Sequence, residues 1–319
     1  MPEATVIIPN YNGLTYLKTC LASLDRQTRK DFDILIVDNG STDGSREWVA
    51  ERYPNIKVLP LDKNYGFCVA VNRGICAAAT PYVILLNNDT EVEPGFVEAL
   101  LAAIKGSGYV FSCQAKMMDF KNRGQMDDAG DLYCALGWSF ARGKGQPEQK
   151  YRHSTEIFSA CAGAAIYRRA VFEEIGLFDE KHFAYLEDVD LGYRARIYGY
   201  VNCFAPEARV YHMGSATTGS THNAFKVRMS ARNSIYVAYK NMPLFQLVLN
   251  SPLLFLGVMI KLLFFSGKHL GKEYRQGVSQ GIRLCSRENK VKYNRKYLGN
   301  YWKIQLELWK NTGRRLRKF

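Results

Sequence analysis

Hydrophobic runs of strand length alternate with helical patterns over the first 108 residues. Four apolar runs end in polar or turn-forming residues: ATVIIPNYN (4–12), FDILIVDNGSTDGS (32–45), IKVLPLDKNYG (56–66) and PYVILLNNDTEV (81–92). The remaining segments predict helices over 14–28, 45–54, 66–79 and 94–108. Strand–helix alternation with short connections predicts an α/β fold with a mostly parallel sheet and right-handed crossovers.

The pattern is less regular after residue 108. Strands are expected at 111–120 and 160–172, and the Gly- and Asp-rich segment 124–149 between them is expected to form long loops. A helix is expected over 187–200, followed by a strand pair within 201–215. The segment after 108 therefore extends the α/β pattern without repeating it.

The fourth run raises a question, because a strand that reads as buried on both faces ends in Asn87, Asn88 and Asp89. Asn and Asp commonly form turns. Asp89 or Thr90 could also cap the helix that begins near Pro94. The third explanation is a ligand, since ligands of open α/β sheets bind beyond the carboxyl ends of the strands. All three explanations stay open on this segment alone.

Polar residues also follow the other strands, and together they predict a site along one edge of the sheet. The residues expected to converge there are Asn10, Asp38, Asn39, Asp43 and Asp89. Neither a GxGxxG motif after the first strand nor a GxxxxGK phosphate loop is present. A nucleotide would then be held through a divalent cation that Asp89 helps to coordinate, because Mg and Mn prefer oxygen ligands shared with phosphates.

Composition places the chain among globular proteins. Its 319 residues are 47% hydrophobic, enough for one large α/β domain with an appendage. The start MPEATVIIPNYN has no basic residues and no long apolar run, so we expect no signal peptide. The eight cysteines form no CxxC pair and are interpreted as reduced core thiols of a cytosolic protein.

The net charge of +13 is concentrated at the carboxyl end. Residues 268–319 contain 15 Lys/Arg and 3 Asp/Glu, a net of +12, which leaves +1 for residues 1–267. A near-neutral body with a basic tail is not the pattern of a globally basic nucleic-acid binder. The tail needs an explanation of its own.

Six motifs together resemble the family 2 inverting glycosyltransferases of the GT-A fold, in particular the bacterial rhamnosyltransferase-like branch. They are VIIPNYN, LIVDNGSTDGS, NYGFCVAVNRG, YVILLNNDTEV, GLFDEKHFAYLEDVDLGYRARIYGY and RVYHMGSAT. The match runs in order from about residue 4 to 240. The expected division is therefore a GT-A catalytic domain over 1–240 and a helical, basic region over 241–319.

The resemblance implies roles for individual residues. Asp38 and Asn39 would recognise the pyrimidine base of the donor, and Asp188 would be the catalytic base. Asp89 matches the last acid of the family's Asp-any-Asp metal motif, whose first acid is replaced here by Asn87. His212 would bind the metal or the diphosphate. The complete donor-binding set that we expect is Pro9, Asn10, Asn12, Asp38, Asn39, Asp43, Asn64 and Asn88.

The chemistry supports these residue types independently. Inverting transfer needs a base that takes the proton of the acceptor hydroxyl, and an Asp can serve. A metal can neutralise the departing diphosphate. The structural alternatives are a helix N-terminal acid for Asp188 and an ordinary hydrogen-bonded histidine for His212. Asp190 and Arg194 are spaced as a structural i,i+4 pair, and Arg168 is expected at a solvated helix start.

The apolar stretch 243–265 is interrupted by five residues: Gln246, Asn250, Ser251, Pro252 and Lys261. We expect two short helices lying in the membrane interface rather than one span. The alternative is a helical hairpin that packs on the catalytic domain or on a partner in a homodimer. The basic, aromatic-rich segment 268–319 suits the anionic inner face of the cell membrane. Nucleic acid is the rival partner.

The hypothesis drawn from the sequence is an inverting glycosyltransferase with a divalent metal cofactor, Mg or Mn. It would transfer sugar from a nucleotide-sugar, UDP- or dTDP-linked, to a glycan or lipid-linked acceptor in cell-surface polysaccharide assembly. A non-catalytic nucleotide-sugar-binding or membrane-scaffold protein is the alternative, favoured by Asn87 and disfavoured by the intact EDVDL at 187–191. A sugar-phosphate nucleotidyltransferase would need a Gly-rich basic loop, which PNYNGLTYLK (9–18) is not.

Overall fold

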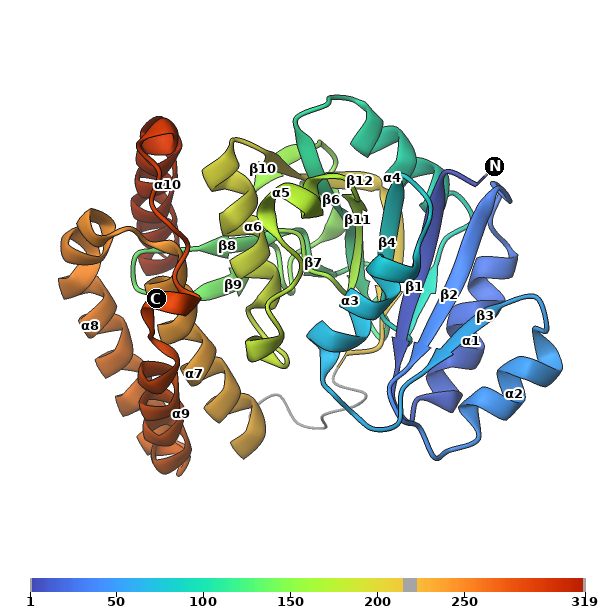
Figure 1. Ribbon diagram of the computed structural model, residues 1–319, viewed down its shortest axis with the longest axis horizontal. Coiled ribbons are helices and arrows are strands. Elements are labelled where there is room, and N and C mark those ends of the chain that lie inside the picture. Colours follow the sequence, from blue (N-terminus) through green and yellow to red (C-terminus); the bar gives the residue numbers. More distant parts are fainter. Residues whose placement is uncertain (1, 215–222, 318–319) are drawn as a thin grey trace.

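The computed structural model describes residues 2–214 and 223–317, so the last residues of the RVYHMGSAT motif lie outside the described part. The strands are β1 Ala4–Asn10, β2 Phe32–Asp38, β3 Lys57–Pro60, β4 Tyr82–Leu86, β5 Thr90–Val92, β6 Val110–Asp119, β7 Met126–Asp128, β8 Asp131–Tyr133, β9 Ser139–Ala141, β10 Thr155–Ile157, β11 Ala164–Arg168 and β12 Val201–His212. The α-helices are α1 Leu14–Asp25, α2 Ser45–Arg52, α3 Phe67–Ala77, α4 Phe96–Lys105, α5 Val171–Ile175, α6 Glu187–Tyr198, α7 Ala224–Asn241, α8 Leu244–Gly267, α9 Gly271–Leu284 and α10 Leu298–Leu316. Figure 1 shows helices α7–α10 gathered at the end of the molecule away from β3.

The central sheet has the strand order β10-β12-β6-β11-β4-β1-β2-β3. Strands β3, β2, β1 and β4 are parallel, and β6 and β12 are parallel to each other. Strand β11 runs antiparallel between β4 and β6, so the parallel strands on both sides of it point the same way. The expected mostly parallel α/β sheet is confirmed. Its carboxyl ends lie along one edge, where register pairs Asn10 with Asp38.

Alternation along β1 distributes side chains to two cores. Val6 and Ile8 pack with helices α1 and α4 on one face of the sheet. Ile7 faces the opposite way and packs with α3 and α5. All three residues are fully buried, as expected for strands covered by helices on both faces. This two-sided packing holds the carboxyl edge of the sheet in place.

Three local expectations are corrected by the structure. The segment 124–149 is not only loops, because it contains strands β7, β8 and β9. The strand pair expected within 201–215 is one strand, β12, over Val201–His212. Its register with β6 shifts between Ala205 and Arg209. Arg168 does not start a solvated helix, since it lies in β11 and its guanidinium donates to the carbonyls of Val110 and Ile104.

The apolar stretch forms one continuous helix, α8, and the expectation of two short helices is wrong. Pro252 removes the amide that would donate to the carbonyl of Val248. The hydroxyl of Ser251 donates to that carbonyl instead, at 2.8 Å, so the helix continues through the proline. Helix α8 is long and apolar enough to cross a membrane, with a mean hydropathy of 2.0.

Two polar residues of α8, Gln246 and Asn250, are buried and face the protein. Gln246 donates to the backbone carbonyl of Tyr301 at 2.8 Å. The side-chain amides of Asn250 and Gln305 exchange two hydrogen bonds of 2.8 Å. The opposite side of α8 carries its exposed apolar residues: Leu244, Val248, Leu249, Phe255, Leu256, Met259, Leu263 and Phe264. Helix α8 is therefore amphipathic, with its polar side occupied by α10.

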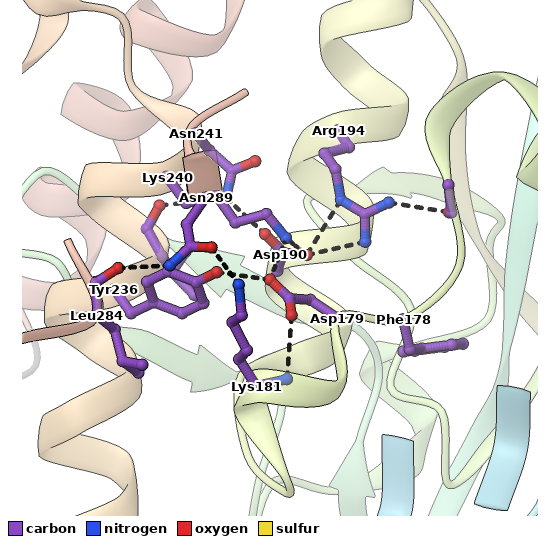
Figure 2. Close-up of polar contacts among 12 residues, drawn as sticks. Phe178, Asp179, Lys181, Asp190, Arg194, Tyr236, Lys240, Asn241, Leu284 and Asn289 are labelled. Atoms are coloured by element: carbon purple, nitrogen blue, oxygen red, sulfur yellow. Dashed lines mark hydrogen bonds and ion pairs between the residues drawn. The ribbon is translucent and has the colours of Figure 1, made fainter. Parts of the chain in front are cut away.

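A buried charge network joins α6 to α7 (Figure 2). The carboxylate of Asp190, fully buried, accepts from Arg194 at 2.8 Å, from Lys240 at 2.9 Å and from Asn241 at 2.8 Å. Lys240 also donates to Asp179 at 2.7 Å. The expected Asp190–Arg194 pair is present and is part of this larger network. The network crosses the expected domain boundary at 240/241.

We predict that Asp190→Asn destabilises the protein by about 3–5 kcal/mol, because the ammonium of Lys240 and the guanidinium of Arg194 would stay buried with less compensation. Chemical denaturation with a linear extrapolation measures this loss. The matched control is Glu51→Gln, which removes an exposed carboxylate on α2 and should leave the unfolding midpoint almost unchanged. A loss below about 1 kcal/mol for Asp190→Asn would contradict the structural role of the network.

Candidate active site

A cleft of about 1130 Å³ opens at the carboxyl edge of the sheet. Eight of the sequence-predicted site residues line it: Pro9, Asn10, Asn39, Asn64, Asn88, Asp89, Asp188 and His212. Asn12, Asp38 and Asp43 do not line it. The cleft is bounded on one side by the strand ends and on the other by the loop before α6 and the start of α7. Its location is the one at which open α/β sheets bind ligands.

A chain of side-chain amides forms the floor of the cleft. Asn88 donates to the side-chain oxygen of Asn10 at 2.7 Å, and Asn10 donates to Asp38 at 3.3 Å. A Cβ at Gly13 would lie 2.0 Å from the amide nitrogen of Asn88, so a larger residue there would displace the Asn88 side chain. Asp38 is 1% exposed and acts from behind this layer by orienting Asn10.

Asn39 and Asn64 order the loop beside the amide floor. The amide of Asn39 donates to Asn64 at 3.0 Å and to the carbonyl of Gly66 at 3.1 Å. Asp43 accepts from the backbone amide of Leu14 at 2.8 Å, so it satisfies the start of α1. Asn12 accepts from the amide of Thr42 at 2.8 Å. Asp43 and Asn12 therefore shape the loops around the cleft from outside its lining.

Asp89 and His212 come together because β5 pairs with β12. The register places His212 opposite Thr90, the residue after Asp89. The Nε2 atom of His212 lies 3.4 Å from Asp89, and its Nδ1 atom lies 2.8 Å from Asp127. Burial alone would lower the pKa of His212, but the hydrogen bonds with Asp127 and Asp89 outweigh it and raise that pKa to about 10.

Asp188 lies in the first turn of α6, after a backbone segment that requires external support. Phe183, Tyr185 and Leu186 all have positive φ, which is unfavourable for residues with a side chain. The amide of Asn233, on α7, donates to the carbonyl of Tyr185 at 2.7 Å and to two other carbonyls of this segment. Helix α7 thereby holds the loop that presents Asp188 to the cleft.

The comparison with known families decides the identity. The family model described as "Glycosyl transferase family 2" matches residues 5–176, more than half of the chain. The chain belongs to glycosyl transferase family 2.

A curated relative extends the likeness beyond that match. The N-acetylglucosaminyl-diphospho-decaprenol L-rhamnosyltransferase of Mycobacterium tuberculosis is 31% identical over 239 residues, covering 67% of this chain and 77% of the relative. The resemblance to rhamnosyltransferase-like family 2 enzymes is therefore confirmed.

Solved structures show that this glycosyltransferase has the GT-A fold. The structure of GalNAc-T7 with UDP, GalNAc and Mn²⁺ aligns with a TM-score of 0.61 and 17% identity, over 75% of this chain and 48% of that chain. The mannosyltransferase PcManGT of Pyrobaculum calidifontis, in complex with GDP-Man and Mn²⁺, aligns with a TM-score of 0.54 and 16% identity. That alignment covers 89% of this chain and 85% of PcManGT.

The glycosyltransferase cleft also contains acidic residues that the sequence interpretation missed. Asp131, on β8, and Glu187 line the cleft with Asp188. Burial, followed by the charge of Asp188, raises the pKa of Asp131 well above its usual value. Burial also raises the pKa of Glu187 to about 8. The Asp-rich composition of segment 124–149 was the only sequence signal for Asp131. Because that segment was interpreted as loops, nothing in the sequence placed Asp131 near Asp188.

Asn87 keeps its place in the cleft without the charge of the family's first acid. Its backbone amide donates to the carbonyl of Gly163 at 2.8 Å, and its side chain lines the cleft. Within residues 2–214 and 223–317, no group of three or more His, Cys, Asp or Glu is arranged to hold a metal by itself. Asp89 and His212 can supply two ligands, and a donor diphosphate would have to supply more.

Proposed function

We propose that this glycosyltransferase transfers a sugar, with inversion, from a UDP- or dTDP-sugar to a lipid-linked acceptor used in cell-surface polysaccharide assembly. The observation that carries the proposal is the position of Asp188, which lines the same cleft as the amide floor Asn10–Asn88. The Mycobacterium tuberculosis relative, by its name, adds L-rhamnose to a lipid diphosphate-linked N-acetylglucosamine. A hexosyl donor and a diphospho-lipid acceptor follow from that likeness.

In this proposal the donor lies along the amide floor. The pyrimidine base of the donor would contact Asn39 and Asn64. Asp38, which does not line the cleft, would keep the side chain of Asn10 oriented. Asn88 would reach the sugar-diphosphate portion from the end of β4. Amides suit this task because they donate to and accept from a neutral base and sugar hydroxyls.

Asp188 would remove the proton of the acceptor hydroxyl as its oxygen attacks the anomeric carbon. A base must be ionised, and three neighbouring carboxyl groups compete for protons in this buried setting. Burial raises the pKa of Asp188, and the hydrogen bond with Asp131 offsets only part of that rise. For Asp131, burial and the same hydrogen bond act together and raise the pKa well above its usual value. Asp131 would therefore carry the proton and leave Asp188 ionised.

Asp89 and His212 would hold a divalent cation together with the donor diphosphate. A carboxylate with an imidazole and phosphate oxygens is a suitable donor set for Mn or Mg. The cation, when bound, would supply positive charge for the departing diphosphate. Asp127 would keep His212 oriented through its Nδ1 atom.

The exposed apolar side of α8 would lie in the interface of the inner face of the cell membrane. To cross the bilayer, α8 would have to leave α10 and expose Gln246 and Asn250 to lipid, which costs the hydrogen bonds they now make. The basic segment 268–319 would add attraction to anionic lipids. In this arrangement the protein would be peripheral, on the cytoplasmic face of the membrane.

Replacement of Asp188 by Asn is predicted to reduce transfer about 10²–10⁴-fold, because the amide cannot accept the acceptor proton. Donor affinity should stay within about threefold, since Asp188 is outside the amide floor. Product formation and equilibrium binding of UDP-sugar or dTDP-sugar measure the two effects. Glu51→Gln, an exposed change on α2, is the control. Transfer within a few-fold of wild type would remove Asp188 as the base.

Chelation of divalent cations is predicted to abolish transfer, and added Mg or Mn should restore it. Asp89→Ala should weaken donor binding at least about tenfold in the presence of metal, because one of two protein ligands is lost. The exposed Asp33, at the far end of β2, provides the control variant Asp33→Ala. Full activity in excess chelator would show that Asn87 has removed the metal requirement.

The double variant Phe255→Asp/Leu263→Asp is predicted to reduce binding to anionic vesicles at least tenfold, because each exposed apolar side chain contributes about 1.5–3 kcal/mol when buried in lipid. Flotation with anionic vesicles at low and high salt measures this. High salt should weaken wild-type binding only partly. Tyr109→Asp, 73% exposed before β6, is the control. Equal flotation of all three proteins would refute the membrane role of α8.

A further inference from the structure

Helix α8 touches the cleft through a close contact with the turn that joins β8 to β9. The indole nitrogen of Trp138 donates to the backbone carbonyl of Gly257 at 3.2 Å. A Cβ at Gly257 would lie 2.2 Å from the carbonyl oxygen of Leu136, so only glycine permits this approach. The inward side of α8 is therefore fixed against the wall of the cleft.

Lys261 follows Gly257 by four residues, so it lies on the same side of α8. Its side chain lines the cleft together with Asp131, Ser139 and Asp188. The ammonium lies 5.4 Å from the centre of the Trp138 ring. Lys261 thus brings a positive charge to the part of the cleft that holds the base, from a helix outside the sheet.

The ammonium of Lys261 has no hydrogen bond or carboxylate within 4.0 Å among residues 2–214 and 223–317, although the cleft is rich in acids. Burial lowers the pKa of Lys261 to about 8, which leaves the group mainly protonated at neutral pH. Lys261 is half-buried, and a partly desolvated ammonium without an anion is unfavourable, so such a group is favoured where a ligand supplies the negative charge. The cation–π contact with Trp138 offsets only a part of that cost.

The location of Lys261 indicates which anion it meets. The amide floor that would hold the donor comes from the ends of β1 and β4, beside the loops that follow β2 and β3, whereas Lys261 comes from α8. The other side of the same helix carries the exposed apolar residues, including Phe255 and Leu263. A lipid-linked acceptor has its phosphate groups between the lipid and the sugar, so a helix with one apolar side and one cationic residue in the cleft matches it.

We propose that Lys261, supported by Trp138, forms a subsite for the diphosphate of a lipid-linked acceptor. This proposal rests on the proposed function, because it assumes that the acceptor approaches from the side of α8. The subsite would hold the acceptor sugar next to Asp188, while the lipid remains along the apolar side of the helix. Specificity for diphospho-lipid acceptors over uncharged glycolipids follows.

The direct test is binding of farnesyl diphosphate, with farnesol as the uncharged comparison, to the full-length protein by tryptophan fluorescence or calorimetry. Lys261→Met should weaken farnesyl diphosphate binding about 10- to 100-fold, the range of a charge-assisted contact. Lys261→Arg should retain most of the affinity. The matched control is Lys57→Met, which removes an exposed cation at the start of β3, at the end of the molecule away from α8, and should change binding less than twofold.

Transfer assays then separate this proposal from the proposed function. Lys261→Met should raise KM about tenfold or more for an N-acetylglucosaminyl diphospho-lipid and leave KM for octyl N-acetylglucosaminide unchanged. If Lys261→Met loses farnesyl diphosphate binding, the subsite is supported. If the wild-type protein also transfers no sugar to any acceptor, the proposed function is refuted while the subsite stands. If Lys261→Met binds farnesyl diphosphate as well as the wild type does, and the wild type transfers sugar, the subsite is overturned and the proposed function stands. Weaker UDP or dTDP binding with unchanged farnesyl diphosphate binding would overturn it by assigning Lys261 to the donor.

Discussion

The buried carboxylate of Asp190 is the constraint on which the arrangement of this glycosyltransferase depends. It lies two residues after Asp188 and accepts hydrogen bonds from α6 itself and from Lys240 and Asn241 at the end of α7. A buried charge of this kind is tolerated only when all of its partners are in place. The position of α7 is therefore coupled to α6, the helix that carries Asp188, the proposed base.

That coupling extends from α7 to the shape of the cleft. Asn233 binds three carbonyls of the strained segment before Asp188, and this segment forms one wall of the cleft. The cost of several positive φ angles is offset by hydrogen bonds from a helix that is distant in the sequence. The C-terminal helices are thus structural supports of the catalytic end as well as the part that faces a membrane in the proposed function. Removing them would uncover the core that Val237 and Met242 share with Tyr301.

The two halves of the cleft differ in their electrostatics. The half in which the donor is proposed to bind is lined by the amides of Asn10, Asn39 and Asn88, which can bind polar groups without adding charge. The half in which the acceptor is proposed to bind combines the carboxyl groups of Asp131 and Glu187 with the ammonium of Lys261. Burial favours protonation of the acids, as the raised pKa of Glu187 near 8 shows, so this half does not carry the full negative charge that its composition indicates. A base can be ionised there while its neighbours remain neutral.

The sequence alone determined the parts of the protein that depend on local pattern. Apolar runs of strand length and helical patterns placed the first four strands and their helices. Chain order placed Asn10, Asn39 and Asp89 at one edge, since parallel strands share their carboxyl end. The ordered motifs determined the family. A local pattern was also sufficient for the Asp190–Arg194 pair, which are neighbours on any helix.

Only the tertiary structure decided how distant segments complete the site. The Asn250–Gln305 pair spans 55 residues and Asp190–Asn241 spans 51, and no local period specifies such partners. In the sequence, Gln246 and Asn250 only interrupt an apolar stretch, because the sequence does not show which side of a helix packs against the rest of the protein. Asp131 lay in a segment without a regular period, so nothing local joined it to the base. These placements follow from packing and from the need to satisfy buried polar groups, which are properties of the whole fold.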